Sequence, residues 1–592
     1  MSERGPEEEP DLNNDPEDSH TGPSESEVPS TQPTSSGRFR PVTLIVTLLV
    51  LIVIVAAGVV FFLFFTDRVS HASEETAEFL PAETYLYFSL NMRPGVGQLL
   101  RFRGILSRFE ENDNFEVQVE ETLDDIEEQL GFDLRDDLFP WMGPELAVGV
   151  VDFGDFDEEM EIVAFLGTTD REAAEAFLPK FLDYLERQQD IDFQAEASGG
   201  FTTYSYTDPE NPPGYHFAVT ESYIVYATSE SLLDSTIARM DNPAATLADT
   251  PDFKRARDSV EDQRFAMLYL DLQAIFDDAR RNIEEDELES LNTMEGSLPD
   301  TLAVSGSFME LGIKVTASYD TPSESFGIEQ VNALKSADYL PADTLALISG
   351  IGVRNAWEEA KGEIENIPGF YGETVEDLIQ GIEDEIGVNI DRDIFGWMSG
   401  EVAFALLPSE FRFGDFLELH DAIIKFAAMV EFDDRQAVQS ALDNIIDALE
   451  ETGLDFEPAT IRGEDALLAD LGEDFGTVDY EPGYVIIDSH VVMGSMRETF
   501  EQAIDARDGS IDTLSEGREF KRIADELEDP PDFLFYANVA GIVDMIVEAM
   551  TPEMRSSYEE DAEPIVEPIE AFLAGASIDE ERTTWTAVLT FE

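Results

Sequence analysis

The chain has 592 residues, and its 129 acidic side chains outnumber its 35 lysines and arginines so far that the formal net charge is −94. Binding to nucleic acid needs a basic surface that neutralises phosphates, and this composition excludes one. The chain has no cysteine, which excludes disulfides, thiolate catalysis and zinc–thiolate sites.

The acidity has two interpretations. At molar salt the Debye length is about 3 Å, so repulsion among like charges on a folded surface is nearly cancelled. An acidic surface is therefore expected of a protein from a halophilic or salt-adapted source. The alternative is weak binding of divalent cations or of a basic partner.

The N-terminal region is predicted to contain three segments. Residues 1–40 form an acidic tail, rich in proline and serine, that has too little apolar surface to fold. Residues 41–66 carry no charge, and roughly 20 apolar residues span a bilayer as a helix, so this segment is predicted to be transmembrane. A cleaved signal peptide is the alternative, but its apolar region has only about 7–15 residues. Residues 67–79 are predicted to be a juxtamembrane linker.

The charges beside the apolar segment predict its orientation. Arg38 and Arg40 precede it, whereas Arg68, paired with Asp67, follows it. Basic residues favour the cytoplasmic side and acids contribute little. We therefore expect a single-pass protein of the cell membrane, with its N-terminus cytoplasmic and its C-terminal domains extracytoplasmic.

Beyond the linker, one long unit occurs twice. Leu-Pro-Ala-Glu-Thr at 80–84 returns as Leu-Pro-Ala-Asp-Thr at 340–344, and Phe-Pro-Trp-Met-Gly-Pro-Glu at 139–145 returns as Phe-Gly-Trp-Met-Ser-Gly-Glu at 395–401. So long a period indicates a duplicated domain and not a solenoid. We predict repeat domain 1 at 80–320, a linker at 321–337 and repeat domain 2 at 338–592.

Hydrophobic periodicity predicts the elements of the first copy. Thr169 to Glu172 form a capping box that opens a helix, and the corresponding device in the second copy is Asp433 to Gln436. Helices are also expected at 96–109 and 117–130. Strands are expected at 84–90, 145–151, 161–166, 192–197, 201–206, 215–219, 223–227, 265–270, 302–309 and 312–319.

Adjacent strands joined by short turns, with helices inserted in blocks, predict the fold class α+β. The expected architecture is an N-terminal transmembrane helix followed by two tandem copies of a mostly antiparallel-sheet domain with helices. A doubly wound fold is the alternative, although strict alternation of strands and helices is missing.

The two Trp-Met sequences are the sharpest local signature. One interpretation is structural: a tight turn leads the chain into a strand, with the Phe and Trp rings packed beneath it and the glutamate accepting backbone hydrogen bonds. The functional alternative makes Glu145 and Glu401 paired site carboxylates. We favour the structural interpretation because both sequences keep the apolar residues and the turn together.

Other motifs are incomplete. Gly95 and Gly97 stand where a dinucleotide loop would begin, but its third glycine is missing. Asn389, Asp391 and Asp393 have the spacing of a calcium loop without its glycine. The acidic stretch 152–159 is expected to be a solvated loop that associates weakly with cations. The remaining candidates are scattered histidines, which show no zinc-binding spacing: His71, His216, His420 and His490.

Taken together, the Leu-Pro-Ala-Asp/Glu-Thr opening, the Trp-Met sequence and the Gly-Tyr sequences at 214–215 and 483–484 resemble the uncharacterised prokaryotic family known as domain of unknown function 3352. The resemblance covers nearly everything after Leu80. It implies an extracytoplasmic protein tethered by an N-terminal transmembrane helix. It implies no activity, cofactor or catalytic residues.

We therefore expect a non-enzymatic binding or envelope-assembly module. Its expected partners are the lipid bilayer, through residues 41–66, and an envelope protein. No catalytic, cofactor-binding or metal-binding residue is assigned. The alternative is a carboxylate-dependent hydrolase with a site between the two repeat domains.

Overall fold

The structure is a computed structural model that describes residues 74–592 with internal gaps. The predicted tail, the predicted transmembrane helix at 41–66 and most of the predicted linker lie outside the described residues. Within the described ranges, no helix is long and apolar enough to cross a bilayer. The gaps are residues 94, 110–123, 125, 155–159, 190, 199–200, 208–213, 283–298, 311, 321–333, 365–374, 410–424, 472–479, 528–529 and 580.

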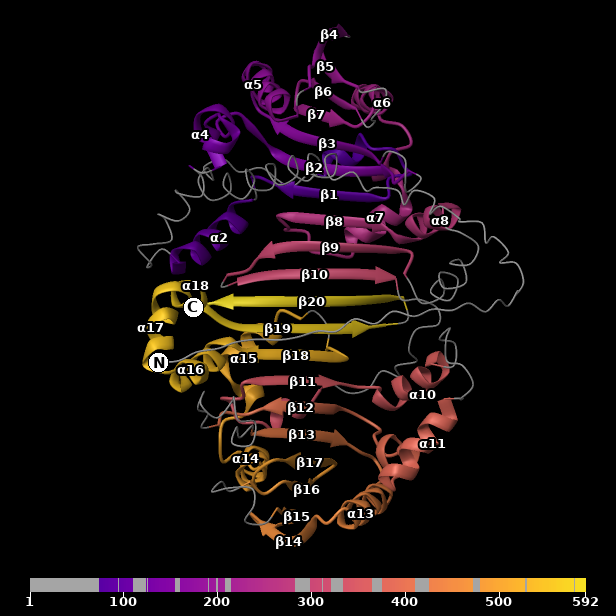
Figure 1. Cartoon of the computed structure of the whole chain (residues 1–592), viewed down its shortest axis with the longest axis vertical. Coiled ribbons are helices and arrows are strands. Elements are labelled where there is room, and N and C mark those ends of the chain that lie inside the picture. Colours follow the sequence, from indigo (N-terminus) through magenta and orange to yellow (C-terminus); the bar gives the residue numbers. More distant parts are fainter. Residues whose placement is uncertain are drawn as a thin grey trace, which may run out of the picture.

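The described chain forms a 20-stranded sheet with helices beside it, so the prediction of an α+β fold is confirmed (Figure 1). The strands of its first half are β1 (Leu86–Asn91), β2 (Met142–Asp152), β3 (Glu161–Thr168), β4 (Gln194–Ser198), β5 (Phe201–Tyr206), β6 (Tyr215–Val219), β7 (Tyr223–Ala227), β8 (Ala266–Asp271), β9 (Thr301–Phe308) and β10 (Gly312–Asp320). Its helices are η1 (Glu75–Glu78), α2 (Val96–Phe109), α4 (Leu134–Asp137), α5 (Arg171–Gln189), α6 (Glu230–Asp241), η2 (Leu247–Asp249), α7 (Pro251–Asp258) and α8 (Leu272–Asn282).

The second half contains the following elements. Its strands are β11 (Ala346–Gly350), β12 (Val402–Leu406), β13 (Phe426–Glu431), β14 (Asp455–Ile461), β15 (Glu464–Asp470), β16 (Gly483–Ile487), β17 (His490–Gly494), β18 (Phe533–Asn538), β19 (Ile569–Ile578) and β20 (Arg582–Phe591). Its helices are η3 (Ser336–Asp338), α10 (Val353–Ile364), α11 (Val375–Ile386), η4 (Ile390–Phe395), α13 (Arg435–Glu451), α14 (Arg497–Arg507), η6 (Leu514–Glu516), α15 (Arg518–Ala524), α16 (Val539–Ala549), α17 (Pro552–Asp561) and α18 (Glu563–Val566).

The strand order is the same in both halves, read from each outer edge toward the middle. One half runs β4-β5-β6-β7-β3-β2-β1-β8-β9-β10, and the other runs β14-β15-β16-β17-β13-β12-β11-β18-β19-β20 (Figure 1). All these pairs are antiparallel. The halves join through β10 and β20, which pair from Gly312 with Thr590 to Asp320 with Arg582. The sheet is therefore continuous across the middle of the molecule.

Both N-terminal capping residues lie one position later than predicted. The carboxylate of Asp170, not the hydroxyl of Thr169, accepts the amide of Ala173 at the start of α5. Asp434, not Asp433, accepts the amides of Gln436 and Ala437 at the start of α13. Thr169 instead donates to a backbone carbonyl, that of Trp141. Aspartate caps a helix as well as threonine does, so the tertiary contact decides which residue caps.

The outer strands are covered on both faces, which explains their aromatic and β-branched sequences. Apolar residues of α5 pack on one face of β2, β3, β6 and β7, and apolar residues of α6 and α7 pack on the other. In the second half, α13 covers one face of β13, β16 and β17, while α14 and α15 cover the other. All residues of β6 and β7 are buried.

Residues just before the two Leu-Pro sequences are buried in the described structure. Thr76 and Ala77 belong to the segment assigned to the juxtamembrane linker, yet both are fully buried in the first half. Ser336 and Ala337 belong to the predicted linker between the copies and are buried in the second half. In each half the packed structure begins before the Leu-Pro sequence.

Candidate functional site

The Trp-Met sequences have the structural role that was favoured. The indole of Trp141 is 4% exposed and that of Trp397 is 6% exposed. Each donates its N–H to a backbone carbonyl four residues earlier, at 2.6 Å to Asp137 and at 2.9 Å to Asp393. The rings anchor the turn that leads into β2 or β12.

Glu145 is a buried carboxylate in β2 that accepts hydrogen bonds from three hydroxyls. Thr76 of η1 donates at 2.7 Å and Tyr87 of β1 at 3.1 Å to Oε1, and Tyr223 of β7 donates at 3.2 Å to Oε2. These donors are side chains from three separate elements, so they depend on the tertiary fold. None of them was predicted, because hydroxyl residues at positions 76, 87 and 223 form no recognisable sequence pattern.

Burial governs the protonation of Glu145. The side chain is 5% exposed, and its removal from water raises the pKa of the carboxyl to about 7, although the hydrogen bonds from Thr76 and Tyr87 oppose the change. The nearby carboxylate and burial together raise the pKa of Tyr87 and that of Tyr223. Glu145 is therefore the described carboxyl that can exchange a proton near neutral pH in this region.

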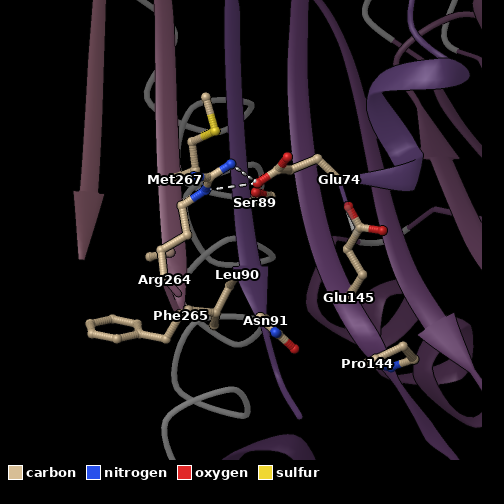
Figure 2. Close-up of a pocket in the computed structure, with 10 residues that line it drawn as sticks. Glu74, Ser89, Leu90, Asn91, Pro144, Glu145, Arg264, Phe265 and Met267 are labelled. Atoms are coloured by element: carbon tan, nitrogen blue, oxygen red, sulfur yellow. Dashed lines mark hydrogen bonds and ion pairs between the residues drawn. The ribbon is translucent and has the colours of Figure 1, made fainter. Parts of the chain in front are cut away.

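A small cavity lies beside Glu145, at the ends of β1, β2 and β8 (Figure 2). On its wall Arg264 pairs with Glu74 at 2.6 Å, and both side chains are largely buried. The cavity volume is about 20 Å³, which is enough for one water molecule but not for a substrate. Its remaining lining residues are Ser89, Leu90, Asn91, Pro144, Phe265, Ala266 and Met267.

Glu401 occupies the corresponding place before β12 but has other partners. Its carboxylate accepts the backbone amides of Lys335 and Ser336, the latter at 3.0 Å, and the hydroxyl of Ser349. This is the predicted role of satisfying backbone donors. Glu145 and Glu401 lie in different halves of the sheet, on β2 and beside β12, so the structure does not bring them together as a carboxylate pair.

The other candidates have structural contacts where they are described. The side chain of Asn389 accepts the amide of Arg392 at the start of η4, and Asp393 forms an ion pair with Arg392. His216 bonds with the hydroxyl of Ser205 at 3.1 Å. His71, His420 and residues 155–159 lie outside the described residues. Within the part of the chain that the structure describes, no cluster of acids and histidines could hold a metal ion.

Two central strands, β10 and β20, bury polar side chains and expose apolar neighbours. On β10 the polar side chains of Lys314, Thr316 and Ser318 are buried, whereas Val315 between them is 41% exposed. The neighbouring strand β20 buries Thr586 and leaves Trp585 39% exposed. The sequence shows this alternation, but hydrophobicity predicts the opposite side to be inside.

The exposed apolar residues lie on one side of the sheet. Strand pairing places one residue from each of six adjacent strands, β12, β11, β18, β19, β20 and β10, in a single row. Ring contacts beside the row join Trp585 to Phe533 at 5.7 Å and Phe535 to Phe572 at 5.9 Å. We call this surface the open face. It comprises Phe404, Ile348, Phe535, Ala574, Ala587 and Val315, with the adjoining Trp585, Phe533 and Phe572.

The fold and these two sites define an α+β protein built on one long antiparallel sheet. A protein-family model described as "Protein of unknown function (DUF3352)" matches residues 44–589, and the chain belongs to that family. The resemblance found in the sequence is thus confirmed. A comparison with curated proteins finds no match.

Solved structures give only a weak likeness. "Structure of crystal form I of TP0453" aligns at 11% identity with a TM-score of 0.23, covering 44% of this chain and 82% of that chain. "Structure of crystal form III of TP0453" aligns at 11% identity with a TM-score of 0.22, covering 45% and 83%. Scores this low carry no argument about the fold or the function.

Proposed function

We propose that this chain is a single-pass, membrane-anchored extracytoplasmic protein that binds a partner on the open face without catalysing a reaction. The observation that carries the proposal is the exposure of large apolar side chains on the central strands: Ile348 is 43% exposed and Phe404 is 42% exposed. A contiguous apolar surface on a chain of net charge −94 is costly to leave in water and is typical of an interaction site.

The proposal includes duplication of one domain. Its support is the recurrence of every strand pairing of β1–β10 within β11–β20, together with the repeated Leu-Pro and Trp-Met sequences. Joining the two copies through β10 and β20 gives a face wider than either copy offers alone. Five of the six strands of the open face belong to the second copy, and the join adds β10 of the first copy.

The anchor is supported by the uncharged segment 41–66 and by the reach of the family match. The match begins at residue 44 and so includes most of that segment. The arginines before the segment favour a cytoplasmic N-terminus. On this arrangement the sheet lies outside the membrane.

No specific observation favours the alternative of a hydrolase between the two repeat domains. The strands at the boundary, β10 and β20, carry only Lys314, Asp320 and Arg582 as charged residues. Two carboxylic acids on opposite sides of a scissile bond are what such an enzyme needs. The cavity beside Glu145 lies within the first half.

The absence of cysteine gives a direct test in intact cells. Full-length chains with Ile348→Cys, Leu347→Cys or Ser19→Cys would be treated with a membrane-impermeant maleimide. We expect labelling at position 348 only, because Leu347 is 1% exposed on the same strand and Ser19 lies in the predicted cytoplasmic tail. Equal labelling at 347 and 348 would contradict an open face. Labelling at 19 without labelling at 348 would reverse the topology.

A further inference from the structure

The open face is free of charge across its width. From Phe404 on β12 to Val315 on β10, each paired residue in the row is aromatic, aliphatic or alanine. Strands lie about 4.8 Å apart, so the five intervals of this row span roughly 24 Å. The row is therefore longer than the ~15 Å that lipid chains occupy in one leaflet, which is half of a ~30 Å hydrocarbon core.

The helix that follows β18 is also largely apolar. α16 follows β18 directly and packs against β18 and β19. Apart from Asp544 and Glu548 it has no charged residue, yet none of its residues is fully buried. A helix that is apolar on almost all sides is normally enclosed by other parts of the protein.

On the proposed topology the anchor tethers the described chain to a bilayer. Glu74, the first described residue, follows residue 66 by eight positions. At most ~3.6 Å per residue, that stretch reaches about 29 Å. At ordinary salt a second copy of the chain is a poorer occupant, because two chains of net charge −94 repel each other. Adsorption to an anionic lipid surface is opposed for the same reason.

We propose that the open face binds the hydrocarbon chain of a lipid drawn from the membrane that holds the anchor. The inference rests on the proposed function and names the ligand class of the same surface. Binding replaces water over the exposed rings of Trp585 and Phe404 and over Ile348 and Val315 with methylene groups. The uncharged row contributes no salt bridge, so recognition depends on the chain and not on the lipid headgroup.

The tryptophans provide a direct readout. The chain has four tryptophans, and none lies in residues 41–66, so the anchor contributes no tryptophan emission. Full-length protein would be reconstituted into vesicles of lipids brominated along their chains, because bromine quenches a contacting indole. We expect quenching in the wild type, its loss in Trp585→Phe and its retention in Trp357→Phe. Quenching that survives in Trp585→Phe would overturn the proposal.

A second pair of variants tests the face itself. Ile348→Asp places a charge in the row, whereas Ile382→Asp makes the same change on α11 at a residue of similar exposure, 42% against 43%. With a fluorescent fatty acid titrated onto the reconstituted protein, we expect at least a tenfold weaker affinity in Ile348→Asp and an unchanged affinity in Ile382→Asp. Equal affinities would contradict the assignment.

The failures of the two proposals are distinguishable. If cysteine at 348 is labelled on intact cells but brominated lipids do not quench Trp585, the face is accessible and its ligand is not a lipid chain. If light scattering instead shows a dimer that Ile348→Asp dissociates, with no quenching, the occupant is a second copy. Either result overturns lipid binding and leaves the extracytoplasmic binding module standing.

Discussion

Glu145 and Glu401 occupy the same place in the two halves, yet they are satisfied in different ways. Glu145 accepts hydroxyl groups from three elements, whereas Glu401 accepts two backbone amides and one hydroxyl. A buried carboxylate in or just before the second strand of each half is thus kept, while its partners differ. The comparison teaches that both halves keep a buried hydrogen-bond acceptor at this place and surround it with different donors.

The largest expected effect concerns the buried tryptophans Trp141 and Trp397, which occupy corresponding places in the two halves. Trp141→Ala and Trp397→Ala each remove a buried ring and its hydrogen bond, and each is expected to lower the free energy of unfolding by about 3–5 kcal/mol. Urea unfolding of the two variants measures this. Similar costs would support equivalent halves. A cost below ~1 kcal/mol at either site would show that the ring is not packed as described.

Glu145 should make the stability of the protein depend on pH. The folded pKa of Glu145, about 7, lies above its ordinary value of 4.5, so the folded state binds the proton more tightly than the unfolded state. Its contribution is complete below about pH 4.5 and is lost as pH rises to 7, a change of ~3 kcal/mol. We expect the free energy of unfolding to change less between pH 5 and pH 8 in Glu145→Gln than in the wild type, by most of that amount. An unchanged difference would mean that Glu145 titrates normally.

Replacing each glutamate by glutamine compares the two sites directly. Glu145→Gln imitates the protonated acid and should be tolerated at pH 5. Glu401→Gln replaces one carboxylate oxygen by an amide donor, and because the backbone amide of Ser336 contacts both oxygens, the variant should cost about 1–3 kcal/mol. Chemical denaturation of the two variants at pH 5 compares them. Equal costs would refute the distinction.

The smallest expected effect is one in which the halves agree. Thr84 and Thr344 donate their hydroxyls to the carbonyls of Pro81 and Pro341, at 2.7 and 2.6 Å. Replacing either threonine by valine should cost about 1 kcal/mol. Thermal unfolding of both variants measures the two losses of stability. A clear difference between them would mean that the halves are equivalent in strand order only.

The sequence was sufficient for the α+β class, the antiparallel pairing and many boundaries. The helix predicted at 96–109 matches α2 (Val96–Phe109), and the strands predicted at 215–219 and 223–227 match β6 and β7. These segments combine a clear periodicity with short, well-marked turns. The capping residues were shifted by one position because Asp170 and Asp434 cap as well as their neighbours.

The sites were beyond the reach of the sequence for two physical reasons. The donors to Glu145 come from residues 76, 87 and 223, and nothing in a single sequence brings such distant hydroxyls together. The open face was missed because polar residues of β10 form the buried side. Lys314 is buried there by an ion pair with Glu261 at 2.6 Å, a partner that the local pattern does not reveal.

The junction between β10 and β20 also governs how the molecule is made. Gly312 pairs with Thr590, so β10 leaves the ribosome long before its neighbour exists. Thr590 follows Gly312 by 278 positions, and at about 5–20 residues per second their synthesis takes roughly 14–56 s. During that time the newborn first half exposes the unpaired backbone of β10, which another chain could engage. Correct folding therefore requires that the second half is synthesised before the exposed edge of β10 pairs with another chain.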